Sequence, residues 1–223
     1  EKKLKIRLHL KILIFIAIFI FTRQIEIYGI LMLFALIHEL GHMFTGIILG
    51  FKPYSLEVMP LGLAISFKTK PEDYNKKIKK GTLLNLKKMI IASAGPLTNI
   101  IIIIFVLISN FNFLSISKET IIYTNILIAI FNLLPIYPLD GGRIINEVLC
   151  LFFKRKDAYI YTNRIANISI ILLTAISSIA ILYIRNVAIL LILAYLWCLI
   201  LNENNKLKNK QIIYKRLEKV SFP

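Results

Sequence analysis

The sequence predicts an all-α membrane protein with six transmembrane helices and a small membrane-associated β-hairpin after the second helix. Three observations lead to this fold class: the apolar share of the chain, its concentration in blocks, and the sidedness of its basic residues. Of the 223 residues, 57% are hydrophobic and the mean hydropathy is +0.73, whereas soluble domains are usually about 45–50% apolar. Composition alone therefore places the chain among integral membrane proteins.

Six apolar blocks are the candidate spans. They cover residues 8–22, 27–49, 89–109, 119–134, 163–184 and 187–201. The first, fourth and sixth are shorter than the about 20 residues that a crossing helix needs, so we expect them to tilt little, to thin the bilayer or to use snorkelling ends such as Lys11. The chain then consists of a six-span core over residues 1–201 and a basic cytoplasmic tail over residues 202–223.

The basic residues follow membrane topology. The formal net charge of +16 raises the question of nucleic-acid binding. With six crossings, however, only Arg23, Lys118 and Arg185 of the 28 Lys and Arg lie on the side opposite the N-terminus. Because basic loops stay in the cytoplasm, we expect both termini there, with anionic membrane lipid as a secondary partner and no nucleic acid.

Two features bear on processing and on the redox compartment. Residues 8–22 have the basic start and short apolar core of a signal peptide, but no small-residue cleavage site follows, so we expect an anchor. The two cysteines, Cys150 and Cys198, are expected on the cytoplasmic face as reduced thiols.

The loop after the second block contains a candidate hairpin. Residues 52–67 read KPYSLEVMPLGLAISF, and apolar residues such as Val58 and Ile65 alternate around a Pro/Gly turn. An exposed hairpin edge could accept a further strand from another chain. A plain amphipathic connector fits the pattern equally well.

The second block carries the motif with the clearest chemistry. His38 to His42 spell HELGH, and this spacing on a helix places two imidazoles one turn apart with a carboxylate beside them. Two neutral imidazoles suit zinc, and the carboxylate of Glu39 suits the activation of water. An ionisable group within a membrane is retained only by a partner or a function, so the motif is more specific here than in a soluble protein.

A zinc site of this kind needs a third protein ligand. His9 lies at the start of the first block and fits an interfacial residue better. Asp140 follows two prolines, Pro135 and Pro138, that end the fourth block on the cytoplasmic side. The second block runs inward towards that side, so Asp140 and the paired histidines can share one depth. Alternatively, Asp140 caps the helix predicted from residue 141.

Three motifs together resemble a known family. HELGH at residues 38–42, SAGPLTN at 93–99 and NLLPIYPLDGGR at 132–143 are similar, in order and spacing, to the site-2 protease family of intramembrane zinc metalloproteases, and most of all to its sporulation members. The resemblance covers residues 1–215. It implies that His38, His42 and Asp140 bind one zinc ion and that Glu39 is the general base.

The resemblance also implies substrate contacts. The Asn of the family's NxxP segment lies near the substrate, so Asn132 and Pro135 are candidate contacts, and the edge of the hairpin around Val58 and Ile65 would hold an unwound substrate extended. For Asn99, as for residues 95–96, we expect a packing role.

The function implied by the resemblance is hydrolysis of a peptide bond in a membrane-associated regulatory protein, with a sigma-factor precursor as the expected substrate and inhibitory membrane proteins as further partners. The loops and the tail are too short for the PDZ or CBS domain of many relatives. Two other functions stay open: a non-proteolytic membrane zinc-binding protein or transporter, and a catalytically silent scaffold.

Overall fold

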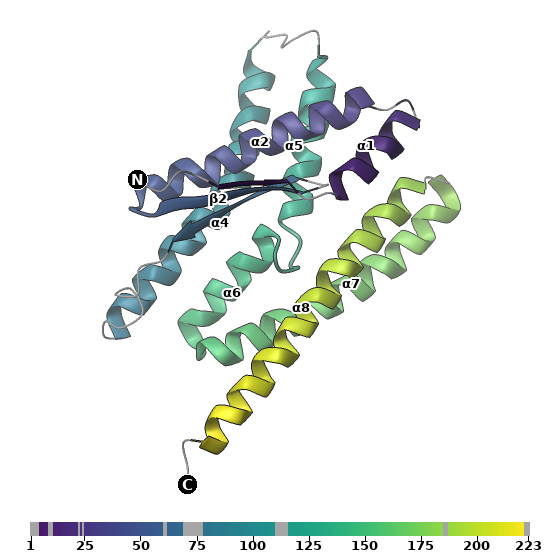
Figure 1. Cartoon of the computed structure of the whole chain (residues 1–223). Helices are drawn as coiled ribbons and strands as arrows, with labels where there is room; N and C mark the ends of the chain where they lie inside the picture. Colours follow the sequence, from purple (N-terminus) through teal and green to yellow (C-terminus); the bar gives the residue numbers. More distant parts are fainter. Residues whose placement is uncertain are drawn as a thin grey trace. The chain divides into compact units, whose positions relative to one another are not determined.

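The computed structural model describes residues 5–8, 11–21, 23, 25–59, 62–68, 78–109, 116–184 and 187–220. The alternative ligand His9 lies outside these residues. The described chain is mostly helical with one small sheet (Figure 1). It divides into two units, Glu1–Leu133 and Leu134–Pro223.

The first unit is built around helix α2 (Ile25–Ile48), which packs against α4 (Ile78–Ile108) and α5 (Lys118–Asn132). Helix α1 (Lys11–Phe21) precedes it. Helix α2 ends in a Schellman motif, because the N–H of Phe51 bonds to the carbonyl of Gly46 and the N–H of Gly50 bonds to that of Ile47. Gly50 has φ +87°, a conformation that only glycine adopts readily. The motif turns the chain directly into the sheet.

The predicted hairpin is present, within a three-stranded sheet. Strands β2 (Lys52–Met59) and β3 (Gly62–Lys68) pair antiparallel, with Val58 opposite Leu63. Strand β1 (Lys5–Leu8) pairs with β2 in parallel, so the order is β1-β2-β3. The prediction that the first span begins at residue 8 was therefore wrong. Leu8 lies in a strand because its backbone pairs with Val58, a partner distant in sequence.

Glycine at position 46 allows the sheet to approach α2. A Cβ at Gly46 would overlap the ring of Phe67 on β3, and the same ring packs edge-on against Phe51, with ring centroids 6.2 Å apart. The hairpin is thus held against the C-terminal part of the helix that carries HELGH.

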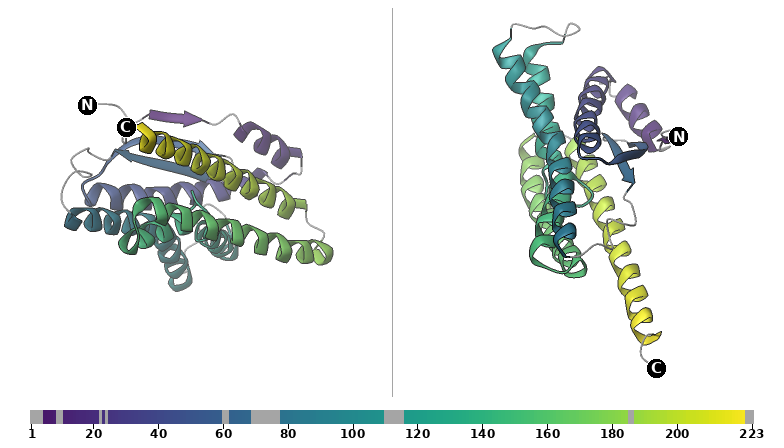
Figure 2. Two further views of the ribbon diagram at one scale, coloured as in Figure 1. Left: turned by 90° about the horizontal axis from the view of Figure 1, so that it is seen from below. Right: turned by 90° about the vertical axis from the view of Figure 1, so that its left-hand side faces the viewer.

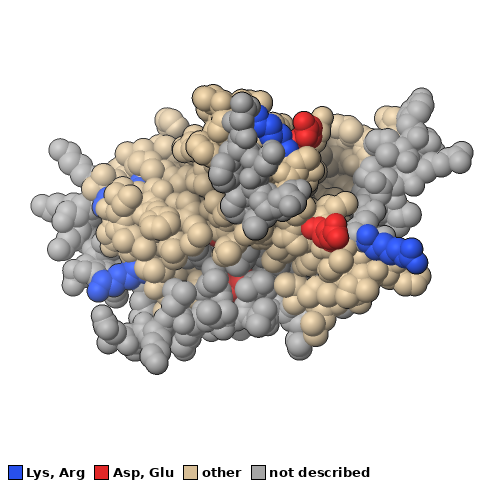
Figure 3. Space-filling view, turned by 90° about the horizontal axis from the view of Figure 1, so that it is seen from above, with Lys and Arg blue, Asp and Glu red and all other residues tan. Residues whose placement is uncertain are grey.

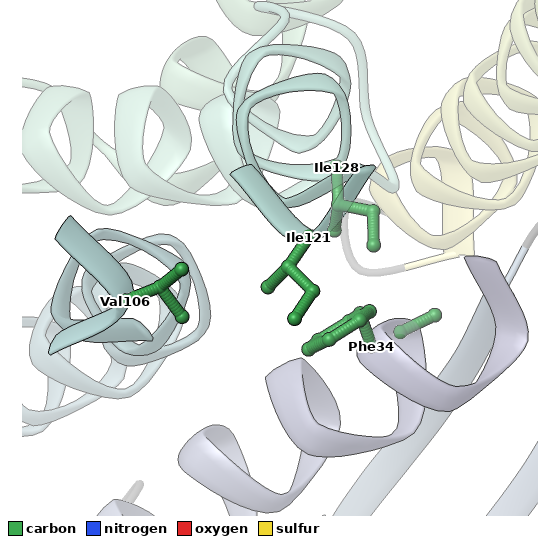
Figure 4. Close-up of a cluster of buried hydrophobic side chains, with 5 residues drawn as sticks. Phe34, Val106, Ile121 and Ile128 are labelled. Atoms are coloured by element: carbon green, nitrogen blue, oxygen red, sulfur yellow. The ribbon is translucent and has the colours of Figure 1, made fainter. Parts of the chain in front are cut away.

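The core of the first unit lies where α2, α4 and α5 meet. Figure 4 shows its buried side chains, Phe34 and Ala35 from α2, Val106 from α4, and Ile121 and Ile128 from α5. Packing of this kind fixes the three helices relative to one another, and thereby fixes the side chains one or two turns further along α2.

The second unit contains α6 (Asp140–Phe152), α7 (Arg155–Ile184) and α8 (Val187–Val220). Helices α7 and α8 lie side by side (Figure 2). Polar side chains join them, for example Trp197, whose indole N–H donates to the hydroxyl of Thr174 at 3.1 Å.

Among the described residues, three helices are long and apolar enough to cross a membrane, not the predicted six: Ile25–Ile48, Thr82–Ile108 and Arg155–Ile179. Helices α1 and α5 have 11 and 15 residues, fewer than the about 20 that a span needs. The sixth predicted span includes side chains outside the described set. On the face shown in Figure 3, few of the described side chains are charged. The apolar helices mark the chain as a membrane protein.

Candidate metal centre

Helix α2 places the three chemical side chains of HELGH in the interior. His38 and His42 are each 2% exposed and Glu39 is 8% exposed. The two imidazole rings lie edge to face, at an interplanar angle of 81°, and their Nε2 atoms are 3.2 Å apart. The one-turn spacing predicted from the motif is therefore confirmed as a pair of converging nitrogens.

The other ring nitrogen of His38 is held by Asn99 on α4. The distance from His38 Nδ1 to Asn99 Oδ1 is 2.9 Å, and the amide nitrogen of Asn99 donates to the backbone carbonyl of Asn125 on α5 at 3.1 Å. Because this second bond needs the NH₂ group, the amide orientation is determined, and Oδ1 accepts a hydrogen bond from the Nδ1–H of His38. His38 therefore carries its proton on Nδ1.

The same reasoning applies to His42. Its Nδ1 lies 2.6 Å from the carbonyl oxygen of Ile91 and 3.3 Å from the backbone nitrogen of Gly95. If Nδ1 accepted a bond from Gly95, its lone pair would face the lone pairs of the Ile91 oxygen at the shorter distance. His42 therefore donates from Nδ1 to Ile91, as metal-binding histidines commonly donate to a carbonyl.

Both Nε2 atoms then present lone pairs to each other. Two unprotonated nitrogens 3.2 Å apart repel unless a cation lies between them. Two nitrogens bound to one tetrahedral zinc ion at the usual bond length are ~3.3 Å apart. The donor set and its spacing therefore fit zinc, and neutral imidazoles held through Nδ1 are in the tautomer that binds it.

Helix α4 approaches this pair closely at Gly95. A Cβ there would meet the Nε2 atoms of both His38 and His42. One turn later, Thr98 lies against Gly41 on α2. The segment SAGPLTN thus has two effects: glycine leaves space beside the histidine nitrogens, and Asn99 orients one ring.

The packing role expected for Asn99 was therefore incomplete. It is fully buried and does join three helices, but its oxygen also sets the tautomer of His38. The sequence held a signal for this role, because Gly95 and Asn99 are four residues apart and share one face of a helix. What the sequence lacked was the partner that this face meets.

Asp140 belongs to the second unit and is buried at the first residue of α6. The N-cap position is occupied by Leu139, so Asp140 is not the N-cap that the alternative interpretation required. Arg143 lies one turn on, with a nitrogen 3.7 Å from the carboxylate. Asp140 therefore has a cationic neighbour and lies at the positive end of the helix dipole, an electrostatic environment that suits a carboxylate.

The turn before Asp140 packs on its own helix. The N–H of Leu139 bonds to the carbonyl of Ile136 at 2.8 Å, and a Cβ at Gly142 would overlap the backbone of Ile136 and Tyr137. The second glycine of LDGG is thus required by close packing. The turn and the first residues of α6 form one unit of local structure.

The predicted substrate contacts occupy less distinctive positions. Asn132 is half-buried at the end of α5 and donates to the carbonyl of Ile128 in its own helix, while Pro135 is half-buried in the following turn.

Val58 lies in the central strand and Ile65 in an outer strand, and the side chains of both are outside the described set. Because the backbone of Val58 pairs on both sides, it cannot receive a further strand, so the edge predicted there is wrong.

Comparisons with known proteins found similarity to a peptidase family, to a site-2 protease of known structure and to a zinc metalloprotease. The model of peptidase family M50 matches residues 117–176. A solved structure, the site-2 protease from Methanocaldococcus jannaschii, superposes with a TM-score of 0.66 at 21% identity and covers 89% of each chain. The protein therefore has the fold of a site-2 protease.

A curated relative agrees with this class. The zinc metalloprotease MJ0392 of Methanocaldococcus jannaschii is 28% identical over 173 residues, which is 72% of this chain and 46% of the relative. The chain thus spans about half the length of that relative.

Proposed function

We propose that this protein is an intramembrane zinc metalloprotease of the site-2 type, in which His38, His42 and Asp140 bind one zinc ion and Glu39 is the general base. The observation that carries the proposal is the pair of Nε2 atoms 3.2 Å apart, with the Nδ1 atom of each ring held by an oxygen acceptor. Further support comes from Asp140, a buried carboxylate at the first residue of α6 and therefore the kind of group that can complete a donor set of two imidazoles. Two imidazoles and one carboxylate leave a position for water, as catalytic zinc sites do.

Each of these groups has a distinct role in the proposed hydrolysis of a peptide bond. A bound zinc ion would polarise the scissile carbonyl and lower the pKa of water at the site. Glu39, adjacent in sequence to His38 and buried with it, accepts the proton of the attacking water and returns it to the leaving amine. Asn99 keeps the Nε2 lone pair of His38 available.

The proposed substrate is a membrane-associated regulatory protein, with a sigma-factor precursor in sporulation as the specific case. It is supported by the likeness of HELGH and LPIYPLDGG to the sporulation protease called stage IV sporulation protein FB. Inhibitory membrane proteins are proposed as further partners, with Asn132 and Pro135 as substrate contacts. Both termini are proposed to lie in the cytoplasm, and the basic residues near them support this orientation.

The test is cleavage by the purified full chain of candidate membrane-tethered precursors in lipid vesicles. We expect cleavage by the unmodified protein, its loss on zinc chelation and its return when zinc is restored. Glu39→Gln should keep one zinc ion per chain but cleave nothing. A transporter would keep zinc flux in this variant, and a scaffold would show no turnover even unmodified. Cleavage by Glu39→Gln, or an unmodified protein that binds no zinc, would overturn the proposal.

A further inference from the structure

Helix α8 carries a buried carboxylate that the proposed chemistry does not use. Glu203 is 4% exposed. It accepts a hydrogen bond from the hydroxyl of Tyr159 on α7 at 2.7 Å and pairs with Lys206 on its own helix at 2.5 Å. Burying a carboxylate is unfavourable unless it is well hydrogen-bonded. The two contacts satisfy both oxygens of Glu203 and fix the position of the Tyr159 hydroxyl.

The neighbouring residue on α8 fixes the register of the two helices. The side-chain oxygen of Asn204 accepts bonds from the amide groups of Asn163 at 2.6 Å and Asn167 at 3.1 Å, and its own NH₂ donates to Asn167 at 3.0 Å. Hydrogen bonds between side-chain amides on neighbouring helices join the helices at defined positions in membrane proteins. Helices α7 and α8 lie side by side along this contact (Figure 2), so Glu203 stays opposite Tyr159.

The ring of Tyr159 in turn contacts the turn that precedes Asp140. It packs edge to face with Tyr137, with centroids 6.2 Å apart and an interplanar angle of 79°, a favoured aromatic geometry. The backbone of Tyr137 lies directly against Gly142, in the same helical turn as Asp140. A shift of the Tyr137 ring would therefore move the backbone from which the Asp140 side chain projects.

We propose that Tyr159, held by Glu203, is a positioning residue that fixes Asp140 for metal binding. The inference rests on the proposed function, because it assigns to Asp140 the role of zinc ligand. Neither Tyr159 nor Glu203 would touch the metal or the substrate. They act through Tyr137, by limiting the orientations of the turn, as residues that orient metal ligands commonly do.

The test measures zinc affinity of the full chain by competition with a chelator. Tyr159→Phe keeps the ring and removes the hydroxyl, and we expect roughly five- to tenfold weaker zinc binding. The matched control is Tyr161→Phe, on the same helix, where the exposed ring packs against Phe153 instead. Its zinc affinity should be unchanged. Cleavage by Tyr159→Phe should recover when zinc is raised, which a loss of stability alone would not produce.

A second set of variants tests the hydrogen bond itself. Glu203→Gln retains an acceptor for the hydroxyl and should bind zinc within about twofold of the unmodified chain. Glu203→Leu should weaken binding as Tyr159→Phe does, and the double variant should be no weaker than either, because both remove one interaction. If Tyr159→Phe lowers the helix content, the Gln and Leu variants decide the question.

The outcomes separate the two proposals. An unmodified chain that binds zinc and cleaves, together with a Tyr159→Phe variant whose zinc affinity equals that of Tyr161→Phe, overturns the positioning role and leaves the protease intact. Additive losses in the double variant also overturn it. An unmodified chain that binds no zinc overturns the proposed function first.

Discussion

Replacement of Asn99 by leucine removes the group that orients His38, while keeping a side chain of similar volume. Asn99 is fully buried, and its Oδ1 lies 2.9 Å from His38 Nδ1. The leucine would leave the Nδ1–H of a buried imidazole without this acceptor, which costs about 1–3 kcal/mol. The ring can avoid that loss by moving its proton or turning, and either change lowers the availability of Nε2. A difference of 1.4 kcal/mol is tenfold in binding, so zinc affinity should fall about 10- to 100-fold.

The assay is chelator competition on the purified chain, with melting of the zinc-free protein measured in parallel. Ser93→Ala is the matched control on α4, because the hydroxyl of Ser93 bonds only to Met89 of the same helix among the contacts described. It should leave zinc affinity unchanged. Asn99→Asp keeps an acceptor for His38 and should retain more affinity than Asn99→Leu.

Unchanged zinc affinity in Asn99→Leu would refute the reasoning, because it would mean that His38 needs no acceptor at Nδ1 to present Nε2. An equal loss in Ser93→Ala would refute it in another way, by showing that any change in this part of α4 disturbs the metal.

Three further outcomes are expected. Gly95→Ala should lose most of its zinc, as measured by metal analysis, because the added methyl occupies the space beside both histidine nitrogens; full zinc content would contradict the geometry. Gly46→Leu should lower the melting temperature by several degrees, for a loss of about 1–3 kcal/mol, since the larger side chain displaces the ring of Phe67 from α2; an unchanged melting temperature would count against that contact. Ile65→Pro on the outer strand should reduce cleavage at unchanged zinc content if substrate adds to β3, whereas Val58→Pro in the central strand should destabilise the sheet itself; normal cleavage by Ile65→Pro would exclude strand addition there.

Local patterns in the sequence predicted much of this protein. The apolar blocks marked the helical segments, since an apolar run long enough to span a bilayer is visible in composition alone. The spacing of His38 and His42 predicted their shared face, because the helical repeat places residues four apart on the same side. The hairpin followed in the same way from alternation around a turn. In each case the information lies within a few consecutive residues.

The tertiary structure decided what depends on partners distant in the chain. Leu8 is in a strand because it pairs with Val58, and the tautomer of His38 is set by Asn99 on another helix. The sequence pattern around Leu8 or His38 does not indicate which distant residue each will contact, because that contact depends on how the whole chain packs. The sequence by itself therefore determined the fold elements and predicted which residues would carry the chemistry, and only the tertiary structure decided which partners hold those side chains in position.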